Sequence, residues 1–301
     1  MGTDRINIVV TGASGLLGRS VAAEAARRGH SVVGTALSRA TDGLVRVDLC
    51  EAAATESFLR AQQPQAIIHC AAEKRPDVAE GDPDAVLRLN AQVPGRLAAL
   101  ARELGAHLVY VSSDYVFDGT SPPYHVDDQP NPLNFYGKTK LAGERAALDA
   151  DPDAAVLRVP VLYGPGAPAE GSINALVELV HASKPTAVDA HQIRFPTCTE
   201  DVARVLVDMA EQRLPGGIYH FSATEQMTKY DVCRVFADIL GVGDTPMLVA
   251  AVDKPQQPVA SRPDNAQLAT DALERAGVDV SCVPFREWWT AYLHGLSSGA
   301  D

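Results

Sequence analysis

The sequence predicts an α/β protein in which a parallel sheet is covered by helices on both faces. Short β-branched runs alternate with longer helical patterns through the first half of the chain. The first of these runs is followed directly by a glycine-rich turn that opens a helix. Strands separated by helical crossovers pair in parallel, and a glycine-rich first turn is typical of a Rossmann-type doubly wound sheet.

The successive elements are predicted from the spacing of the apolar residues. Strands are expected at 6–10, 30–34, 45–47, 66–70, 108–112 and 155–159, where short apolar and β-branched runs occur. Helices are expected at 17–28, 53–62, 83–104 and 136–148, where the apolar residues follow a longer period.

After residue 159 this alternation breaks. Proline and glycine cluster at 160–168 and 254–263, and helical patterns remain at 199–212 and 229–240. We therefore expect a cofactor-binding Rossmann domain at 1–159 and a smaller C-terminal lobe at 160–301 that mainly binds substrate. Segments around 199–221 are equally compatible with a return to the main sheet.

Composition and charge exclude several classes of protein. The 301-residue chain has a formal net charge of −12, and an acidic surface repels the phosphate backbone of nucleic acid. Its five cysteines are widely spaced and form no C-x-x-C pair, so neither a disulfide framework nor a metal site is expected. No stretch approaches the roughly 18 apolar residues of a membrane-spanning helix. We expect a cytoplasmic protein with no nucleic-acid or membrane partner.

The glycine-rich turn has the spacing G-x-x-G-x-x-G. Glycines here permit a tight turn and let the backbone approach a pyrophosphate, and the helix N-terminus supplies N–H groups and a positive dipole. The alternative is a glycine-rich turn that binds nothing. The residues expected to contact a dinucleotide are Gly12, Ser14, Gly15, Leu16, Leu17 and Gly18.

The end of the second expected strand selects the cofactor. A carboxylate there would bind the ribose 2′-hydroxyl of NAD, whereas an arginine accommodates the 2′-phosphate of NADP. No acidic residue occurs from 30 to 40, and Ser38 and Arg39 come after the strand. NADP is therefore expected, although a solvated arginine would look the same. Asp48 is expected either to accept from the adenine amino group or to serve as a turn residue.

Three residues form a candidate catalytic set. Tyr136 and Lys140 are four residues apart in an expected helix, hence on one face. A nearby ammonium lowers the pKa of a tyrosine from roughly 10 toward the range useful for proton transfer. Ser113 ends a strand, where ligand sites of parallel sheets lie. Each feature alone is ordinary for a surface pair or a turn, but together they indicate a Ser–Tyr–Lys set.

These motifs resemble the extended short-chain dehydrogenase/reductase superfamily over nearly the whole chain. The run S-D-Y-V-F-D-G at 113–119 resembles the dTDP-4-dehydrorhamnose reductase branch. Further runs are similar to the regulatory beta subunits of methionine adenosyltransferase, a group within that branch. These runs lie at 69–78, 136–141, 194–197, 225–230 and 262–268.

The resemblance implies a role for each matching residue. Gly12, Gly15 and Gly18 would hold the pyrophosphate, and Ser38 with Arg39 the 2′-phosphate. Lys140 would also bond the nicotinamide ribose, and the loop at 192–197 would face the substrate. The other residues implied at the cofactor are Asp48, Leu49, Cys70, Ala71, Ala72, Arg158, Val159 and Pro160. Those implied at the substrate are Asp114, Gln192 and Arg194.

The leading hypothesis is an NADPH-dependent reductase of a ketone, either nucleotide-sugar-like or another small polar carbonyl. The alternative is an NADP-binding regulatory subunit of methionine adenosyltransferase, and a third option is a cofactor sensor without turnover. The related beta subunits anchor through a tail of basic and aromatic residues, whereas the run at 296–301 here is small and acidic. We therefore expect no complex with the catalytic subunit, and a homodimer is left open.

Overall fold

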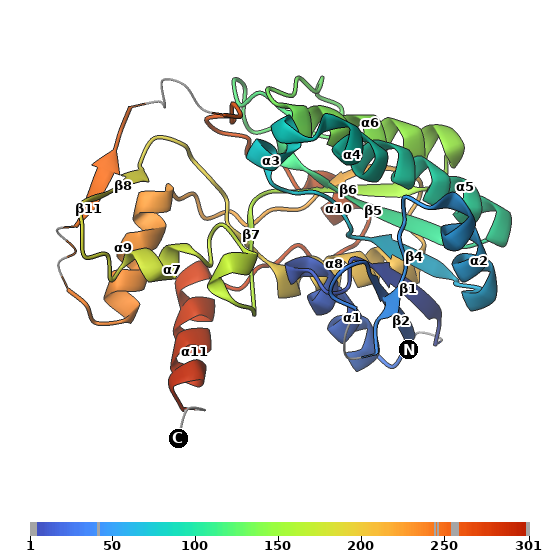
Figure 1. Ribbon diagram of the computed structural model, residues 1–301, viewed down its shortest axis with the longest axis horizontal. Coiled ribbons are helices and arrows are strands. Elements are labelled where there is room, and N and C mark those ends of the chain that lie inside the picture. The colour runs from blue at the N-terminus through green and yellow to red at the C-terminus, as the bar shows by residue number, and fades with distance from the viewer. Residues whose placement is uncertain (1–4, 41–42, 244, 246, 254–258, 299–301) are drawn as a thin grey trace.

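The computed structural model describes residues 5–40, 43–243, 245, 247–253 and 259–298. Its centre is a seven-stranded parallel sheet in the order β10-β6-β5-β4-β1-β2-β3 (Figure 1). The strands are β1 (Asn7–Thr11), β2 (Ser31–Ala36), β3 (Val45–Arg46), β4 (Ala66–His69), β5 (His107–Ser113), β6 (Ala155–Val159) and β10 (Gly217–His220). The predicted doubly wound α/β fold is confirmed.

Helices cover both faces of this sheet (Figure 1). On one face lie α1 (Leu16–Arg27) and α8 (Thr199–Gln212). On the other lie α2 (Ala52–Gln62), α5 (Val93–Leu104) and α6 (Phe135–Ala150). Successive strand residues point to opposite faces, so Ile8 and Val10 pack under α1 and α8 while Val9 packs under α5. The uninterrupted apolar runs of the strands are buried for this reason.

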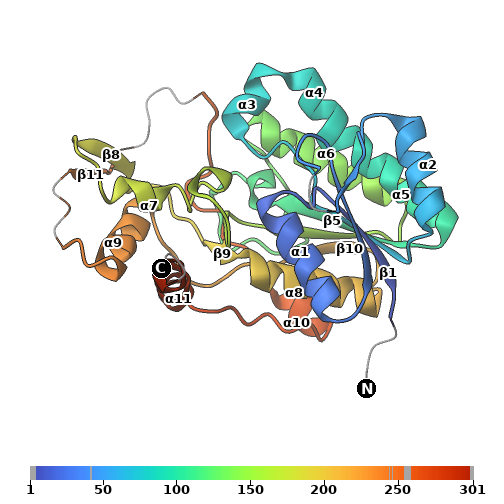
Figure 2. The same ribbon diagram turned by 60° about the horizontal axis from the view of Figure 1, so that its bottom comes forward.

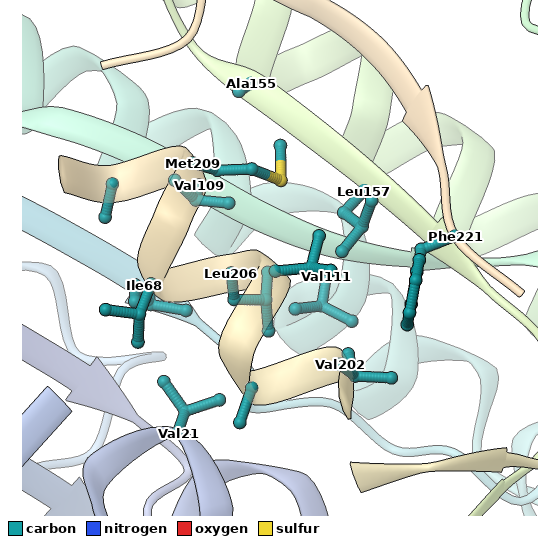
Figure 3. Close-up of a cluster of buried hydrophobic side chains, with 14 of the residues drawn as sticks. Val21, Ile68, Val109, Val111, Ala155, Leu157, Val202, Leu206, Met209 and Phe221 are labelled. Carbon is teal, nitrogen blue, oxygen red and sulfur yellow. The ribbon is translucent and has the colours of Figure 1, made fainter. Parts of the chain in front are cut away.

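The segment at 199–221 returns to the main sheet. Helix α8 packs Val202, Leu206 and Met209 against side chains of β5 and β6 (Figure 3). Strand β10 then pairs in parallel with β6, with Tyr219 opposite Leu157. The apolar face of α8 therefore packs into the core of the main sheet, although α8 comes well after residue 159 in the sequence.

A smaller group of elements stands beside the sheet (Figures 1 and 2). Its core is aromatic, and Trp289 packs against both Tyr163 and Phe236. It contains the parallel pair β8 (Thr186–Asp189) and β11 (Leu248–Ala251), with the two-residue pair β7 (Leu162–Tyr163) and β9 (Thr197–Cys198) beside it. Its helices are α7 (Leu176–Leu179), α9 (Lys229–Ile239) and α11 (Phe285–Ser298).

The expected helix at 83–104 is interrupted. It consists of α4 (Pro83–Leu87), a π-helical turn η1 (Arg88–Gln92) and α5. Pro94 has no N–H to donate to the carbonyl of Asn90, and the Tyr110 hydroxyl donates to that carbonyl instead, at 3.2 Å. The proline thus changes the winding without ending the helical segment.

Several short elements were not expected from the pattern. They are α3 (Pro76–Gly81), η2 (Asp114–Val116), η3 (Pro168–Glu170), α7, α10 (Asp271–Arg275) and the four short strands beside the sheet. Segments of two to six residues are too short for apolar periodicity to show. No helix in the described ranges combines the length and apolarity needed to cross a membrane. The tail hypothesis falls partly on 299–301, which lie outside the described residues.

Truncating a side chain of α8 tests its place in the main core. Leu206 is fully buried, so Leu206→Ala should lower the free energy of unfolding by about 2–5 kcal/mol through lost burial and a residual cavity. Urea denaturation measures this. The matched truncation Leu37→Ala, at a side chain 51% exposed, should change it by less than about 0.5 kcal/mol. Equal losses for the two variants would contradict this packing.

Candidate active site

The glycine-rich turn has no room for side chains. Gly12 has a φ of +67°, and a Cβ atom there would lie 2.8 Å from the backbone nitrogen of Ala71. A Cβ on Gly18 would overlap the carbonyl oxygen of Gly12. The turn therefore packs closely against the segment after β4. It also packs closely against the first turn of α1. Gly15 is the N-cap of α1 and brings no side chain to its first N–H groups, which suits them to an external anion.

The segment after β4 completes this edge of the sheet. The Oγ1 of Thr11 lies 2.7 Å from Nδ1 of His69 and accepts from the N–H of Ala71 at 3.4 Å. Burial lowers the pKa of His69 to about 3, so the imidazole is neutral. Cys70, Ala71 and Ala72 are half-buried beside the glycine turn, where the resemblance implies that they line the cofactor site.

Some of the residues expected to bind the adenosine part of the cofactor already have partners within the protein. Ser38 and Arg39 are exposed after β2. Arg39 reaches the carboxylate of Glu170 at 3.3 Å. Asp48 accepts from the N–H of Cys50 at 2.9 Å, which is the behaviour of a turn residue. Leu49 is buried behind it.

Ser113 and Tyr136 are brought together. Ser113 ends β5, and Tyr136 lies in the first turn of α6, whose N-cap Asn134 accepts from Gly137 at 2.8 Å. Gly137 packs so closely under the carbonyl of Tyr115 that a Cβ atom would clash with it. Burial raises the pKa of the Tyr136 hydroxyl well above its ordinary value, and hydrogen bonding with Ser113 opposes this. Tyr136 is therefore protonated at neutral pH.

Lys140 lies on the same helix but is directed to the backbone of β5. Its ammonium donates to the carbonyl of Val111 at 2.7 Å and lies 4.2 Å from the centroid of the Tyr110 ring. Burial lowers the pKa of Lys140 to about 7, and Glu144 partly offsets this. After burial and Ser113, the groups that act most strongly on Tyr136 are Asp114, Tyr115 and Glu73. The expected action of Lys140 on the pKa of Tyr136 stays a prediction, since the ammonium is bonded to Val111 here.

Arg158 is committed to a buried ion pair. Its Nε and Nη2 donate to the two carboxylate oxygens of Glu144 at 2.9 and 2.7 Å, and both side chains are almost fully buried. Ser112 donates to the same carboxylate at 2.5 Å, and His220 lies beyond the guanidinium. Any contact between this segment and a cofactor therefore falls to the backbone or to the buried Val159 and Pro160.

The residues expected at the substrate form one buried group. Ser113 donates to Asp114 at 3.0 Å, and burial raises the pKa of Asp114 to about 6 against the opposing effect of Arg194. Arg194 donates to Gln192 at 2.6 Å and to the carbonyl of Pro263 at 2.9 Å. Arg194 is thus held by its own neighbours, close enough to Asp114 to affect its pKa.

Two further cations lie near this group, and although their runs carry the family resemblance, no role at the site was predicted for them. Arg194 pairs through its backbone with Met227, which brings Lys229 near. Burial lowers the pKa of Lys229, and the cations Arg194 and Arg262 lower it further. Their separation along the chain left no local signal for this cluster.

Two other findings concern possible sites elsewhere. A hollow of about 460 Å³ lies after β10 and against the segment before α11. None of its lining residues was expected at a site; they are Ser222, Ala223, Thr224, Glu225, Val280, Ser281, Cys282 and Pro284. Among the described residues, no group of three or more His, Cys, Asp or Glu is placed to hold a metal ion.

Comparison with known proteins identifies the family. The model of the RmlD substrate binding domain matches residues 6–297. The chain belongs to this family. It is 45% identical to methionine adenosyltransferase 2 subunit beta of Bos taurus over 285 residues, covering 93% of this chain and 84% of that one. It is 32% identical to the dTDP-4-dehydrorhamnose reductase of Mycolicibacterium smegmatis over 295 residues, covering 97% and 85% of the two chains.

A solved structure of this family has the same fold. The crystal structure of a dTDP-4-dehydrorhamnose reductase from Clostridium acetobutylicum superposes with a TM-score of 0.86 at 28% identity, covering 97% of this chain and all of that one. The resemblance stated from the sequence motifs is confirmed.

The buried Asp114 should make stability depend on pH. Its folded-state pKa of about 6 lies above the ordinary value of 3.8, so ionisation opposes folding. The cost is absent below pH ~4 and complete above pH ~6, where it reaches about 2–3 kcal/mol. The free energy of unfolding of Asp114→Asn minus that of wild type should therefore be about 2–3 kcal/mol larger at pH 8 than at pH 4. Urea denaturation at both pH values measures it.

Asp118→Asn is the control of opposite sign. Hydrogen bonds from Tyr124, Thr120 and Asn131 lower the pKa of Asp118, so its carboxylate stabilises the fold above its ordinary pKa and loses this effect as the pH falls. Asp118→Asn should thus lose stability relative to wild type mainly as the pH rises from about 2 to about 4, and the difference between the two should change little between pH 4 and pH 8. A pH-independent difference for Asp114→Asn would contradict the burial of an ionisable group there.

Proposed function

We propose that this protein is an NADP(H)-dependent reductase of a ketone that uses Ser113, Tyr136 and Lys140. The observation that carries the proposal is the pairing of Ser113 with a protonated Tyr136 at the edge of the sheet that also holds the glycine-rich turn. A proton donor and an oxygen-binding hydroxyl beside a dinucleotide site are what carbonyl reduction needs. Relatives named dTDP-4-dehydrorhamnose reductase support this class of reaction.

The residues at this edge fit a nicotinamide dinucleotide. The glycine turn lets a pyrophosphate approach the backbone, and the uncapped first turn of α1 supplies N–H groups for it. Arg39 and the lack of an acid after β2 favour the 2′-phosphate of NADP. Bound NADPH would supply a hydride. We assign cofactor binding mainly to 1–159 and substrate binding mainly to 160–301, with the packing of α8 and β10 supporting inclusion of 199–221 in the first part.

The chain's own groups carry the proton chemistry. Ser113 would hold the substrate oxygen, and Tyr136 would give its phenolic proton to that oxygen as negative charge develops on it. Burial supports the acid role because it keeps Tyr136 protonated at neutral pH. Lys140 would leave the Val111 carbonyl to bond the hydroxyls of the nicotinamide ribose. We propose a nucleotide-sugar-like or other small polar carbonyl as substrate, with Asp114, Gln192 and Arg194 on its far side.

Removing the phenolic hydroxyl tests the chemistry. Tyr136→Phe deletes the proton donor and leaves the ring, so NADPH oxidation with a reducible ketone should fall by a factor of about 10²–10⁴. NADPH affinity, measured by fluorescence titration, should change little. The control is Tyr219→Phe, at a tyrosine whose hydroxyl donates to Pro215 far from this edge. Unchanged turnover in Tyr136→Phe would refute the assigned role.

A second function is favoured by a different observation. The chain is 43–45% identical to methionine adenosyltransferase 2 subunit beta of several vertebrates, over 92–93% of its length. That degree of identity exceeds the 32% shared with a named reductase. The second candidate is therefore an NADP-binding subunit that acts on a methionine adenosyltransferase.

Co-purification separates the two candidates. The chain and the methionine adenosyltransferase of its own organism should not form a complex of micromolar affinity if reduction is the function. Calorimetry measures binding, and the synthetase rate with and without the chain measures regulation. A complex that changes that rate, and does so equally with Tyr136→Phe, would overturn the reductase proposal in favour of the subunit.

A further inference from the structure

Three cations from separate parts of the chain surround one glutamate. Glu170, in η3, accepts from Arg19 at 2.5 Å through one carboxylate oxygen and from Arg39 at 3.3 Å through the other. The ammonium of Lys74 donates to its backbone carbonyl at 2.6 Å. The cations come from α1, from the segment after β2 and from the segment after β4, so only the fold brings them together.

This group lies directly over the start of α1. A Cβ atom on Gly171 would lie 3.1 Å from a methyl carbon of Leu16, and one on Gly166 would lie 3.2 Å from the other. The segment at 166–171 therefore passes across the first turn of the helix, next to the glycine turn. Glu170 thus stands beside the N–H groups proposed to hold phosphate.

The charges of the group do not cancel. Arg19 and Arg39 face the carboxylate of Glu170, and Lys74 donates to its backbone carbonyl, in a chain whose net charge is −12. The other carboxylate that acts on Lys74 is Glu73, which is paired with Arg75. Burial acts to raise the pKa of Glu170, but hydrogen bonds from Arg19 and from the N–H of Ala167, with the charges of Arg19 and Arg39, outweigh it, so the pKa is lowered. Burial and the neighbouring Arg39 lower the pKa of Lys74. The carboxylate is ionised, and positive charge is left over for another anion.

A carboxylate and a phosphate use the same donors. Both accept paired N–H groups from a guanidinium fork, and a phosphate monoester carries more charge and a third terminal oxygen. Glu170 therefore occupies a place built for an oxyanion. It does so with an exposed Arg39, the residue that the absence of an acid after β2 assigns to a 2′-phosphate.

We propose that Arg19, Arg39 and Lys74 form a phosphate-monoester subsite and that Glu170 is its internal occupant, which an incoming phosphate displaces. This inference rests on the proposed NADP site and deepens it, because Glu170 then competes with the 2′-phosphate and sets the affinity for NADPH. A cofactor without that phosphate has nothing to gain from displacing the carboxylate. The ligand class is a phosphate monoester dianion; free inorganic phosphate offers the same charged terminal oxygens without the ester.

Neutralising the occupant tests the proposal. Glu170→Gln keeps the shape of the side chain but removes the charge, so the affinity for NADPH and for adenosine 2′,5′-bisphosphate should rise about tenfold. The affinity for NADH should change less than about twofold, since NADH lacks the 2′-phosphate. Calorimetric titration of the full chain measures all three, and inorganic phosphate added as a competitor shows whether free phosphate uses the same subsite.

Two further variants separate displacement from a general change in charge. Glu178→Gln removes the same charge from an exposed position in α7 and should leave all affinities unchanged. In an Arg19→Gln background, Glu170→Gln should raise NADPH affinity by less than about threefold, because the carboxylate has lost its nearest cation. Urea denaturation of each variant verifies that it is folded.

The outcomes distinguish this inference from the proposed function. Weaker NADPH binding by Glu170→Gln would show that Glu170 clamps the cofactor, and an equal gain for NADH or in Glu178→Gln would show a general charge effect; either overturns the inference. Unchanged NADPH binding also overturns it while the cofactor proposal stands. If NADPH does not bind but adenosine 2′,5′-bisphosphate binds better to Glu170→Gln, the subsite stands and the cofactor proposal fails.

Discussion

The parallel pairing of β1, β4, β5 and β6 assembles the candidate site of this protein. Parallel strands end at one edge, so the glycine turn, the segment after β4 and Ser113 meet there although they lie far apart in sequence. Helices on both faces bury the strands, and this burial requires apolar runs on both sides of each strand. The close contact of Gly12 and Gly18 with their neighbours then holds the start of α1 at this edge.

Burial also determines the electrostatics of that edge. The main effect on Tyr136, Lys140 and Asp114 is the removal of water, which favours the neutral form of each. Below them, Arg158 and Glu144 remain paired and hydrogen-bonded, which is how a charged pair is tolerated in an interior. The edge thus combines a protonated phenol with an ammonium that is ready to lose its proton. A bound anion would shift this balance because it would favour the charged lysine.

The family relationship leaves one fold with two activities to consider. A dinucleotide-binding site can belong to an enzyme that turns over a substrate or to a regulatory subunit that only binds the cofactor. The fold alone does not decide between them. The Ser113–Tyr136 pair favours turnover, whereas the identity of 43–45% to subunits of methionine adenosyltransferase favours assembly. Glu170 bears on both, since it would govern occupation of the cofactor site whether the bound cofactor serves turnover or assembly.

Features that depend on neighbours along the chain could be predicted from the amino-acid sequence alone. The main strands and helices, the glycine turn and the spacing of Tyr136 and Lys140 belong to this group because sterics and periodicity act locally. Elements of two to six residues and the π-helical turn before Pro94 could not be predicted in this way, since such short segments show no apolar periodicity. Tertiary contacts alone determine that Lys140 bonds Val111, that Arg158 pairs with Glu144, and that Glu170 meets Arg19 from 151 residues away. Such partners are chosen by burial and by the geometry of facing segments, which no local pattern records.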